Sequence, residues 1–182
     1  MILYHGTKTY FDEFSLDFIG QNARNEGAGI YLTDSKDVAK SYAYDDGYIL
    51  SVEFNCKKPL SSTEVTLTYG EINELILTLH EEVNLLEDIN DISYYGIEAV
   101  LEEAIEMFSN NECDTDLISE IGNTIGDHKL VLDTIYNKFG YDHIVTKASW
   151  GYDLGQKNIY VVLNPSLLNI VKRETYEELK EK

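Results

Sequence analysis

The sequence predicts an α+β fold, and three observations support this prediction. Short runs of β-branched and aromatic residues mark strands near both ends of the chain. Residues 70–125 instead follow the i, i+3, i+4, i+7 apolar spacing of amphipathic helices. The chain has 182 residues, 43% of them hydrophobic, which is enough to bury a core. We therefore expect a single domain, residues 1–182, with a helical insertion at residues 63–125.

The N-terminal segment is expected to begin with a strand, Ile2-Leu3-Tyr4, that runs into a His-Gly-Thr turn. The next segment contains Phe11, Phe14 and Phe18 at about helical spacing but is weakly capped, so we expect a loop with a short helical turn. Residues 21–29 are polar and contain glycine, which is typical of a loop.

A second short strand is expected around Tyr31. Asp34-Ser35 forms an N-cap signal before the apolar positions of a short amphipathic helix that ends near Tyr42. Residues 48–54 are rich in β-forming residues and predict a strand, which Pro59 would stop.

The middle of the chain predicts three helices. Apolar residues at helical spacing define helices within residues 72–86 and 97–108 and a short third helix at 116–121, ending before Gly122. Acidic residues fall mostly on the faces opposite these apolar stripes. The segment is therefore expected to pack one face on the core and to expose an anionic face.

The C-terminal part returns to strands. Residues 130–139 predict a helix closed by Gly140. Strands are expected at 143–146 and 159–163, separated by a polar loop at 149–157. Residues 166–171 predict a last strand or turn, and the charged tail after Lys172 predicts a frayed helix.

The net charge of −19 is unevenly distributed. Between Pro59 and His128 there are 17 acidic residues and no lysine or arginine. Such a surface repels nucleic acid and attracts basic partners, although it also serves general solubility. We expect no direct nucleic-acid binding and a basic protein partner.

Several classes of protein are not expected. No apolar run approaches the roughly 20 residues that span a bilayer, and the N-terminus lacks the pattern of a signal peptide. Cys56 and Cys113 match no metal spacing and predict free thiols in a reducing cytoplasm. The histidines show no paired ligand spacing, so no metal site is predicted.

Three short motifs could form a nucleotide site. They are His5-Gly6-Thr7, the stretch Gly27-Ala28-Gly29-Ile30-Tyr31, and Tyr42 at the end of the following helix. A histidine at a strand end can hold a ribose hydroxyl, a glycine beside it exposes backbone donors, and two tyrosines can clamp a flat ring.

In this order the motifs resemble the ADP-ribosyltransferases of the His-Tyr-Glu group, which includes diphtheria toxin and the poly(ADP-ribose) polymerases. The order of elements at residues 128–172 is similar to that in small phage-encoded members. The resemblance implies two small packed sheets that form an NAD cleft, with NAD as substrate. It implies that these residues bind NAD: His5, Gly6, Thr7, Tyr31, Ser35 and Tyr42. His5 and Tyr31 would also take part in catalysis.

The third position of the group's motif departs from the usual glutamate. Ile159 stands where the glutamate is expected, directly before Tyr-Val-Val. Asp153 is the nearest carboxylate and ranks first as the group that stabilises positive charge on the ribose, followed by Gln156 and then Asn158.

The resemblance thus implies an NAD-dependent mono-ADP-ribosyltransferase acting on a basic, nucleic-acid-binding protein. The phage-like spelling suggests an effector in the host cytoplasm that inactivates a defence or transcription protein. Two alternatives stay open. One is a catalytically inactive binding module that mimics nucleic acid, and the other is an NAD glycohydrolase.

Overall fold

The computed structural model describes residues 1–15, 29–149 and 155–180. It divides into two compact units. Within the described ranges, one unit comprises residues 1–15, 29–57 and 143–180, and the other comprises residues 58–142. We call them the strand unit and the helical unit. The expected insertion, residues 63–125, lies inside the helical unit.

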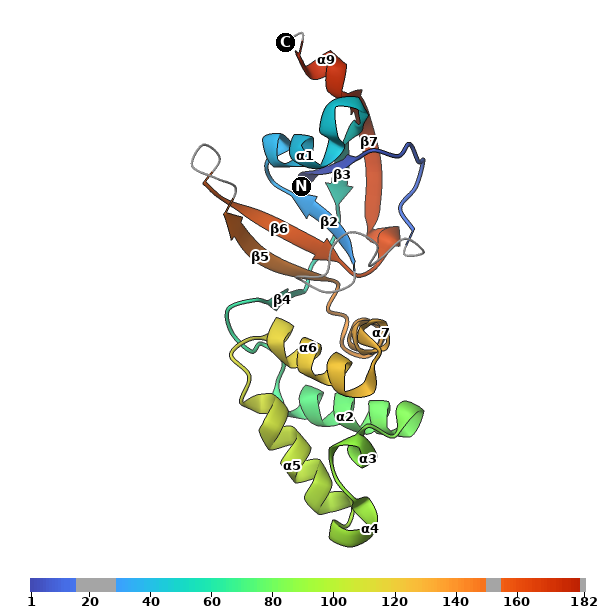
Figure 1. Cartoon of the computed structure of the whole chain (residues 1–182), viewed down its shortest axis with the longest axis vertical. Coiled ribbons are helices and arrows are strands. Elements are labelled where there is room, and N and C mark those ends of the chain that lie inside the picture. Colours follow the sequence, from blue (N-terminus) through green and yellow to red (C-terminus); the bar gives the residue numbers. More distant parts are fainter. Residues whose placement is uncertain (16–28, 150–154, 181–182) are drawn as a thin grey trace. The chain divides into compact units, whose positions relative to one another are not determined.

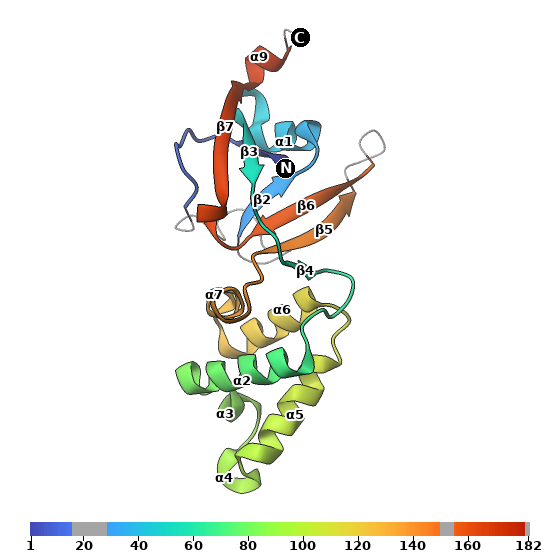
Figure 2. The same cartoon turned by 180° about the vertical axis from the view of Figure 1, so that it is seen from behind.

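The strand unit is an antiparallel ladder (Figure 1). Its strands follow the spatial order β5-β6-β2-β1-β3-β7. Figure 2 shows β7 beside β3, to which it pairs from Tyr48↔Thr175 to Phe54↔Leu168. The strand bounds are Ile2–Thr7 (β1), Ile30–Thr33 (β2), Tyr48–Phe54 (β3), His143–Ser149 (β5), Gln156–Val162 (β6) and Leu168–Thr175 (β7).

The α+β class is confirmed, and the arrangement of the strands refines it. We expected two small sheets, but the hydrogen-bonded ladder is continuous because β2 pairs with both β1 and β6. The junction is narrow, since β1 and β2 share one register pair, Tyr4↔Thr33. The β1–β3 ladder, in contrast, runs from Ile2↔Glu53 to Thr7↔Tyr48.

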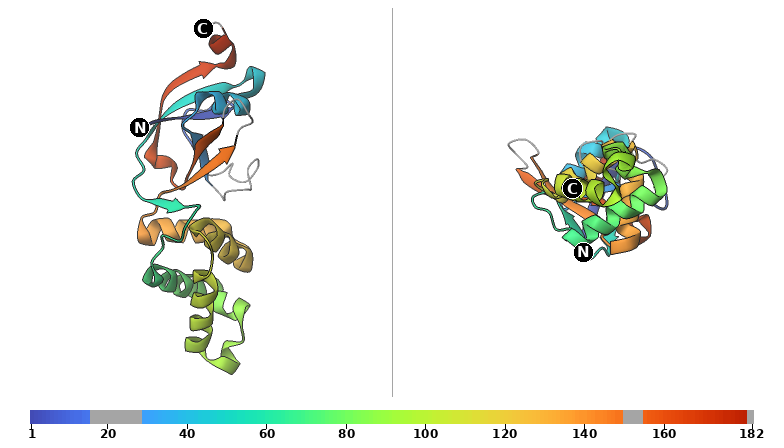
Figure 3. Two further views of the ribbon diagram at one scale, coloured as in Figure 1. Left: turned by 90° about the vertical axis from the view of Figure 1, so that its left-hand side faces the viewer. Right: turned by 90° about the horizontal axis from the view of Figure 1, so that it is seen from below.

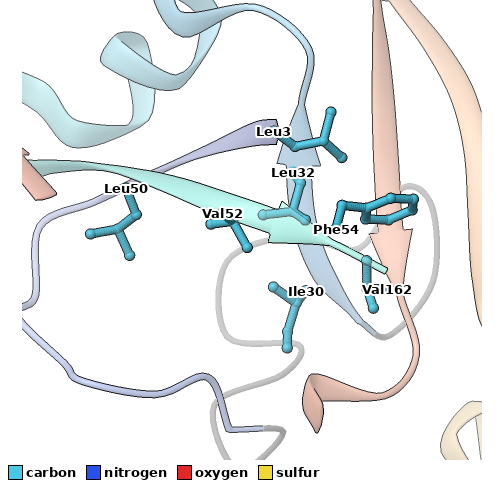
Figure 4. Close-up of a cluster of buried hydrophobic side chains, with 7 residues drawn as sticks. All are labelled: Leu3, Ile30, Leu32, Leu50, Val52, Phe54 and Val162. Atoms are coloured by element: carbon cyan, nitrogen blue, oxygen red, sulfur yellow. The ribbon is translucent and has the colours of Figure 1, made fainter. Parts of the chain in front are cut away.

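One face of this sheet carries a buried apolar cluster from four strands (Figure 4). Opposed residues of an antiparallel ladder share a face, so the pairs Leu3↔Val52 and Ile30↔Val162 project to the same side. Phe11 and Phe14 pack against the cluster. Its buried members are Leu3, Ile30, Leu32, Leu50, Val52, Phe54 and Val162.

The opposite face is covered by α1, Lys36–Ala43. Ser35 caps this helix by accepting a hydrogen bond from the backbone N–H of Val38 at 3.4 Å, as the sequence predicted. Ala39 and Ala43 are buried against Ile49 of β3. A 3₁₀ turn, Tyr44–Asp46, follows the helix and leads into β3.

The helical unit is built around α2, which packs against α3, α5 and α7 (Figure 3). Thr68 and Glu71 form a capping box at the start of α2. Most residues of the predicted apolar stripes are buried, and Leu75, Phe108 and Leu117 are fully so. Val83 and Ile97, at helix ends, are exposed instead. The bounds are Pro59–Ser61 (β4), Tyr69–Val83 (α2), Leu85–Ile89 (α3), Ile92–Tyr95 (α4), Ile97–Ser109 (α5), Asp114–Ile125 (α6) and His128–Phe139 (α7).

The structure corrects two predicted ends. The His-Gly-Thr segment is not a turn, because pairing with β3 continues to Thr7 and keeps it extended. The third predicted helix does not end before Gly122, since α6 runs to Ile125. Gly122 is accommodated there because the His128 ring occupies the space that a side chain would need.

Other boundaries differ in smaller ways. Residues 11–15 form no helical turn, and Pro59 begins β4. The tail continues as strand to Thr175 before a short helix, Tyr176–Lys180 (α9). A 3₁₀ turn, Pro165–Leu167, precedes β7. Phe18, residues 21–28 and most of the loop predicted at 149–157 lie outside the described residues.

Among the helices in the described ranges, none has the length and apolar character needed to cross a membrane.

Candidate active site

His5 is fixed by a bond to the neighbouring strand. Its Nδ1 donates to the carbonyl oxygen of Tyr31 at 2.8 Å. Phe11 and Phe14 meet the ring edge-on, with centroids 6.0 and 5.3 Å away. The residue keeps some exposed surface, but burial of the ring lowers the pKa of His5 below its usual 6.5 and outweighs the raising effect of the Tyr31 carbonyl.

The bond to Tyr31 also fixes the tautomer of His5. A carbonyl oxygen only accepts, so Nδ1 must carry the proton. In the neutral ring, which the lowered pKa favours, Nε2 is then a hydrogen-bond acceptor. His5 can therefore accept a hydrogen bond from a ligand hydroxyl group at Nε2 while the ring stays neutral.

Gly6 lets α1 approach the sheet closely. An added Cβ would lie 2.8 Å from the carbonyl carbon of Ala39 and closer still to its oxygen, and 3.0 Å from the backbone nitrogen of Ala43. These distances are shorter than the 3.4 Å at which ordinary contact begins. A glycine is required at this position because the helix backbone fills the space of a side chain.

Tyr31 and Tyr42 lie on elements that meet at this face. Tyr31 is half-buried in β2, and its partner in β6 is Val161. The register pair Tyr4↔Thr33 puts Tyr31 on the same side as Tyr4 and Gly6, the side that α1 covers. Tyr42 is exposed in the last turn of α1. Tyr31 therefore projects to the side of the sheet that α1 covers, and Tyr42 is part of that helix.

Thr7 and Ser35 have local structural bonds. Thr7 Oγ1 donates to the carbonyl oxygen of Thr9 at 3.2 Å and shapes the chain after β1. The hydroxyl oxygen of Ser35 accepts the hydrogen bond from Val38 that caps α1. Both side chains therefore have a local structural role. Their roles in binding NAD stay predictions.

The position where the motif's glutamate is expected holds an apolar residue, Ile159. Ile159 pairs with Thr33, so it projects to the same side as Tyr31, and it is only 6% exposed. Asn158 and Tyr160 project to the other side, together with Leu32. Gln156 is exposed at the start of β6, and Asp153 lies outside the described residues.

Asn158 instead leads to a carboxylate that sequence reasoning did not single out. Its Nδ2 donates to Asp34 Oδ2 at 2.7 Å, and the backbone N–H of Asp34 donates to the Asn158 carbonyl at 3.5 Å. Desolvation raises the pKa of Tyr160, and the charge of Asp34 adds to that shift. The sequence indicates Asp34 only as part of the N-cap signal of α1. Its fixed spacing from Tyr31 is the one sequence feature that could have marked it as a candidate site residue.

A buried carboxylate, Glu174, ties α1 to the edge of the sheet. Glu174 of β7 bonds Lys36 at 2.5 Å and Lys172 at 3.0 Å. The hydrogen bond from Lys36 is the main cause that lowers the pKa of Glu174, against the opposing effect of burial. This ion pair holds the first turn of α1 in place and so supports the position of Tyr42.

Together, these residues give a glycine and two tyrosines on the α1 side of the sheet, and a neutral histidine acceptor on the opposite side, beside Phe14. A flat ring and a ribose are the ligand groups that such side chains suit. Comparison with known proteins agrees with this reading. Residues 1–175 match the family described as ADP-Ribosyltransferase in polyvalent proteins. Neither the curated proteins nor the solved structures gave a match. The chain belongs to this family of ADP-ribosyltransferases.

Proposed function

We propose that this protein is an NAD-dependent mono-ADP-ribosyltransferase that modifies a macromolecule. The observation that carries the proposal is the bond between His5 and the Tyr31 carbonyl, which joins the first two motif positions within the segment that matches the family. Tyr42 would complete the surroundings of a nicotinamide ring, and Gly6 would let α1, which carries Tyr42, pack close to β1.

The reaction breaks the bond between the ribose C1′ and the nicotinamide nitrogen, and nicotinamide leaves with the electron pair. A nucleophile on the target forms the new bond to C1′ and loses its proton. His5, neutral and fixed by Tyr31, would orient a ribose hydroxyl through Nε2. Tyr31 and Tyr42 would hold the nicotinamide ring.

The positive charge that develops on the ribose needs a stabilising group nearby. Asp153 remains the first candidate, followed by Gln156 and Asn158. The contact at 2.7 Å between Asn158 and Asp34 supports a further possibility, in which Asn158 orients the Asp34 carboxylate toward the ligand.

The target would be a basic protein that binds nucleic acid. The charge distribution supports this, since 14 of the 17 acidic residues between Pro59 and His128 are exposed. Modification of a residue that faces nucleic acid would add two phosphates and block binding by charge and bulk. The resemblance to phage-encoded members supports the role of an effector against a host defence or transcription protein.

The test uses purified protein and NAD labelled on the adenylate phosphate, incubated with a bacterial lysate. We expect the wild type to label a protein and to release nicotinamide, and His5→Ala, folded by circular dichroism, to lose both by at least about 100-fold. If the wild type labels nothing and releases no nicotinamide, the proposal is wrong. Nicotinamide release without a labelled protein would instead identify a glycohydrolase.

A second candidate is a binding module that holds NAD or a partner without turnover. The buried Ile159 on the Tyr31 side favours it, because an apolar side chain there cannot stabilise a developing charge. This candidate predicts that inhibition of the partner survives His5→Ala and Tyr31→Ala but is lost when acidic residues of the helical unit are neutralised.

A further inference from the structure

Seven consecutive residues of the helical unit, 93–99, are exposed, and several of them are apolar. Tyr94 is 78% exposed, Tyr95 56% and Ile97 47%. They lie on α4 and at the start of α5 (Figure 1). We call Tyr94, Tyr95 and Ile97 the tyrosine tip. Large aromatic side chains gathered in one exposed patch are typical of interaction sites and are enriched among the residues that dominate binding energy.

The backbone of the tyrosine tip is held in place before any partner binds. The Asp91 carboxylate caps α4 by accepting from the backbone N–H of Ser93 at 2.9 Å. The backbone N–H groups of Tyr94 and Tyr95 both donate to the Asp91 carbonyl at 3.1 Å. Because the chain is already ordered, binding would cost less conformational entropy than at a disordered segment.

The side chains of the tip are ordered as well. The Tyr94 and Tyr95 rings meet edge-on with centroids 4.7 Å apart. The turn before α4 is tied to α5 by a bond from Asn90 Nδ2 to Glu103 Oε2 at 3.0 Å. The two rings therefore contact each other and form one aromatic patch.

The charges around the tip select the kind of partner. Asp88, Asp91, Glu98 and Glu102 are exposed beside it. Hydrogen bonds from Ser93 lower the pKa of Asp91, so this carboxylate is ionised at neutral pH. The sequence has no lysine or arginine between Pro59 and His128 to offset these charges. An arginine side chain can stack on a tyrosine ring and pair with a carboxylate at the same time.

We propose that the tyrosine tip docks an arginine-rich segment of a protein that also supplies an apolar anchor. The inference rests on the proposed function, since it names the surface that would bring the basic target to the enzyme. Nucleic acid is disfavoured as the partner because its phosphates carry the same sign of charge. A second copy of the chain is disfavoured for the same reason, because residues 58–142 hold 19 of the 33 acidic residues and 3 of the 14 basic ones.

The test measures binding of a fluorescent synthetic peptide with an amphipathic arginine–leucine pattern, by anisotropy, without NAD. We expect the wild type to bind and Tyr94→Ala/Tyr95→Ala to weaken the affinity at least about 10-fold. The matched control is Tyr69→Ala, since Tyr69 is 66% exposed in the same acidic unit but lies at the start of α2. Its affinity should stay within about 2-fold of the wild type.

Three results would overturn the proposal. The first is no binding by the wild type. The second is an affinity of the double variant equal to that of the wild type, which would show attraction by charge alone, or an equal loss in Tyr69→Ala, which would show that the tyrosine tip has no special role. The third is concentration-dependent dimers that the double variant abolishes, which would identify a second copy as the occupant. Release of nicotinamide from NAD should be unchanged in the double variant, so failure of the docking proposal is separate from failure of the transferase proposal.

Discussion

Replacing Gly6 with alanine tests how α1 and β1 form the site. The new Cβ would lie 2.8 Å from the carbonyl carbon of Ala39, whereas ordinary contact begins at 3.4 Å. The α1 backbone must therefore retreat by at least about 0.6 Å, and by more at the Ala39 oxygen. Overpacking of this kind costs about 2 kcal/mol. For a chain of this size, the melting temperature should fall by roughly 4–8 °C.

The same displacement should affect the reaction, because α1 carries Tyr42 and a shift of about 1 Å can cost about 100-fold in rate. Thermal melts by circular dichroism and nicotinamide release measure the two effects. Gly70→Ala is the matched control, since an added Cβ meets nothing within 4 Å in α2 and should raise stability by up to about 1 kcal/mol. An unchanged melting temperature and rate in Gly6→Ala would refute the close approach of α1 to β1.

Three further predictions concern contacts within the helical unit or within the strand unit. Asp114 is fully buried and accepts hydrogen bonds from the backbone N–H groups of Ser61, Thr66 and Leu67. Asp114→Ala should therefore lower the free energy of unfolding in urea by about 3 kcal/mol. The control Glu102→Gln, at an exposed position, should change it by less than about 0.5 kcal/mol, and equal effects of the two variants would contradict the role of Asp114. Lys36 holds the pKa of Glu174 below its usual 4.5, so its contribution to stability is present at neutral pH and lost as the pH falls through that lowered pKa. Glu174→Gln should therefore melt at a lower temperature than the wild type at pH 7, and its melting temperature should fall less as the pH is lowered. If the melting temperatures of the two proteins fall in parallel with pH, the ion pair does not make this contribution. Tyr42→Ala should raise the KM for NAD about 10-fold because one of the two rings that hold the nicotinamide is lost. Tyr44→Ala, at an exposed neighbouring position, should leave the KM unchanged. A similar rise in both variants would count against this role of Tyr42.

Local signals predicted the elements that surround the site. The strand at 48–54, the helix capped by Ser35 and the Gly140 end of α7 are confirmed, because each depends on neighbours within one turn or strand. The resemblance to ADP-ribosyltransferases named His5 and Tyr31 as site residues, and the bond from His5 Nδ1 to the Tyr31 carbonyl shows that the two positions are neighbours. Their role in binding NAD stays a prediction.

Contacts between distant parts of the chain could not be predicted in this way. Asn158 and Asp34 are 124 positions apart, and Glu174 and Lys36 are 138 apart. Asp114 belongs to a segment whose acidic residues are otherwise mostly exposed, and the backbone donors that explain its burial lie near residue 61–67. Periodicity places a side chain on a face but does not indicate which residue of another element will meet it.

The most direct test of the central claim is a titration of the protein with NAD, followed by the backbone amide signals in nuclear magnetic resonance. An NAD site at the junction of β1, β2 and α1 should give saturable shifts at Gly6, Tyr31 and Tyr42 and much smaller shifts in residues 58–142. His5→Ala should weaken the binding at least about 10-fold. No shifts at these three positions, or shifts confined to the helical unit, would contradict an NAD site at the junction of β1, β2 and α1.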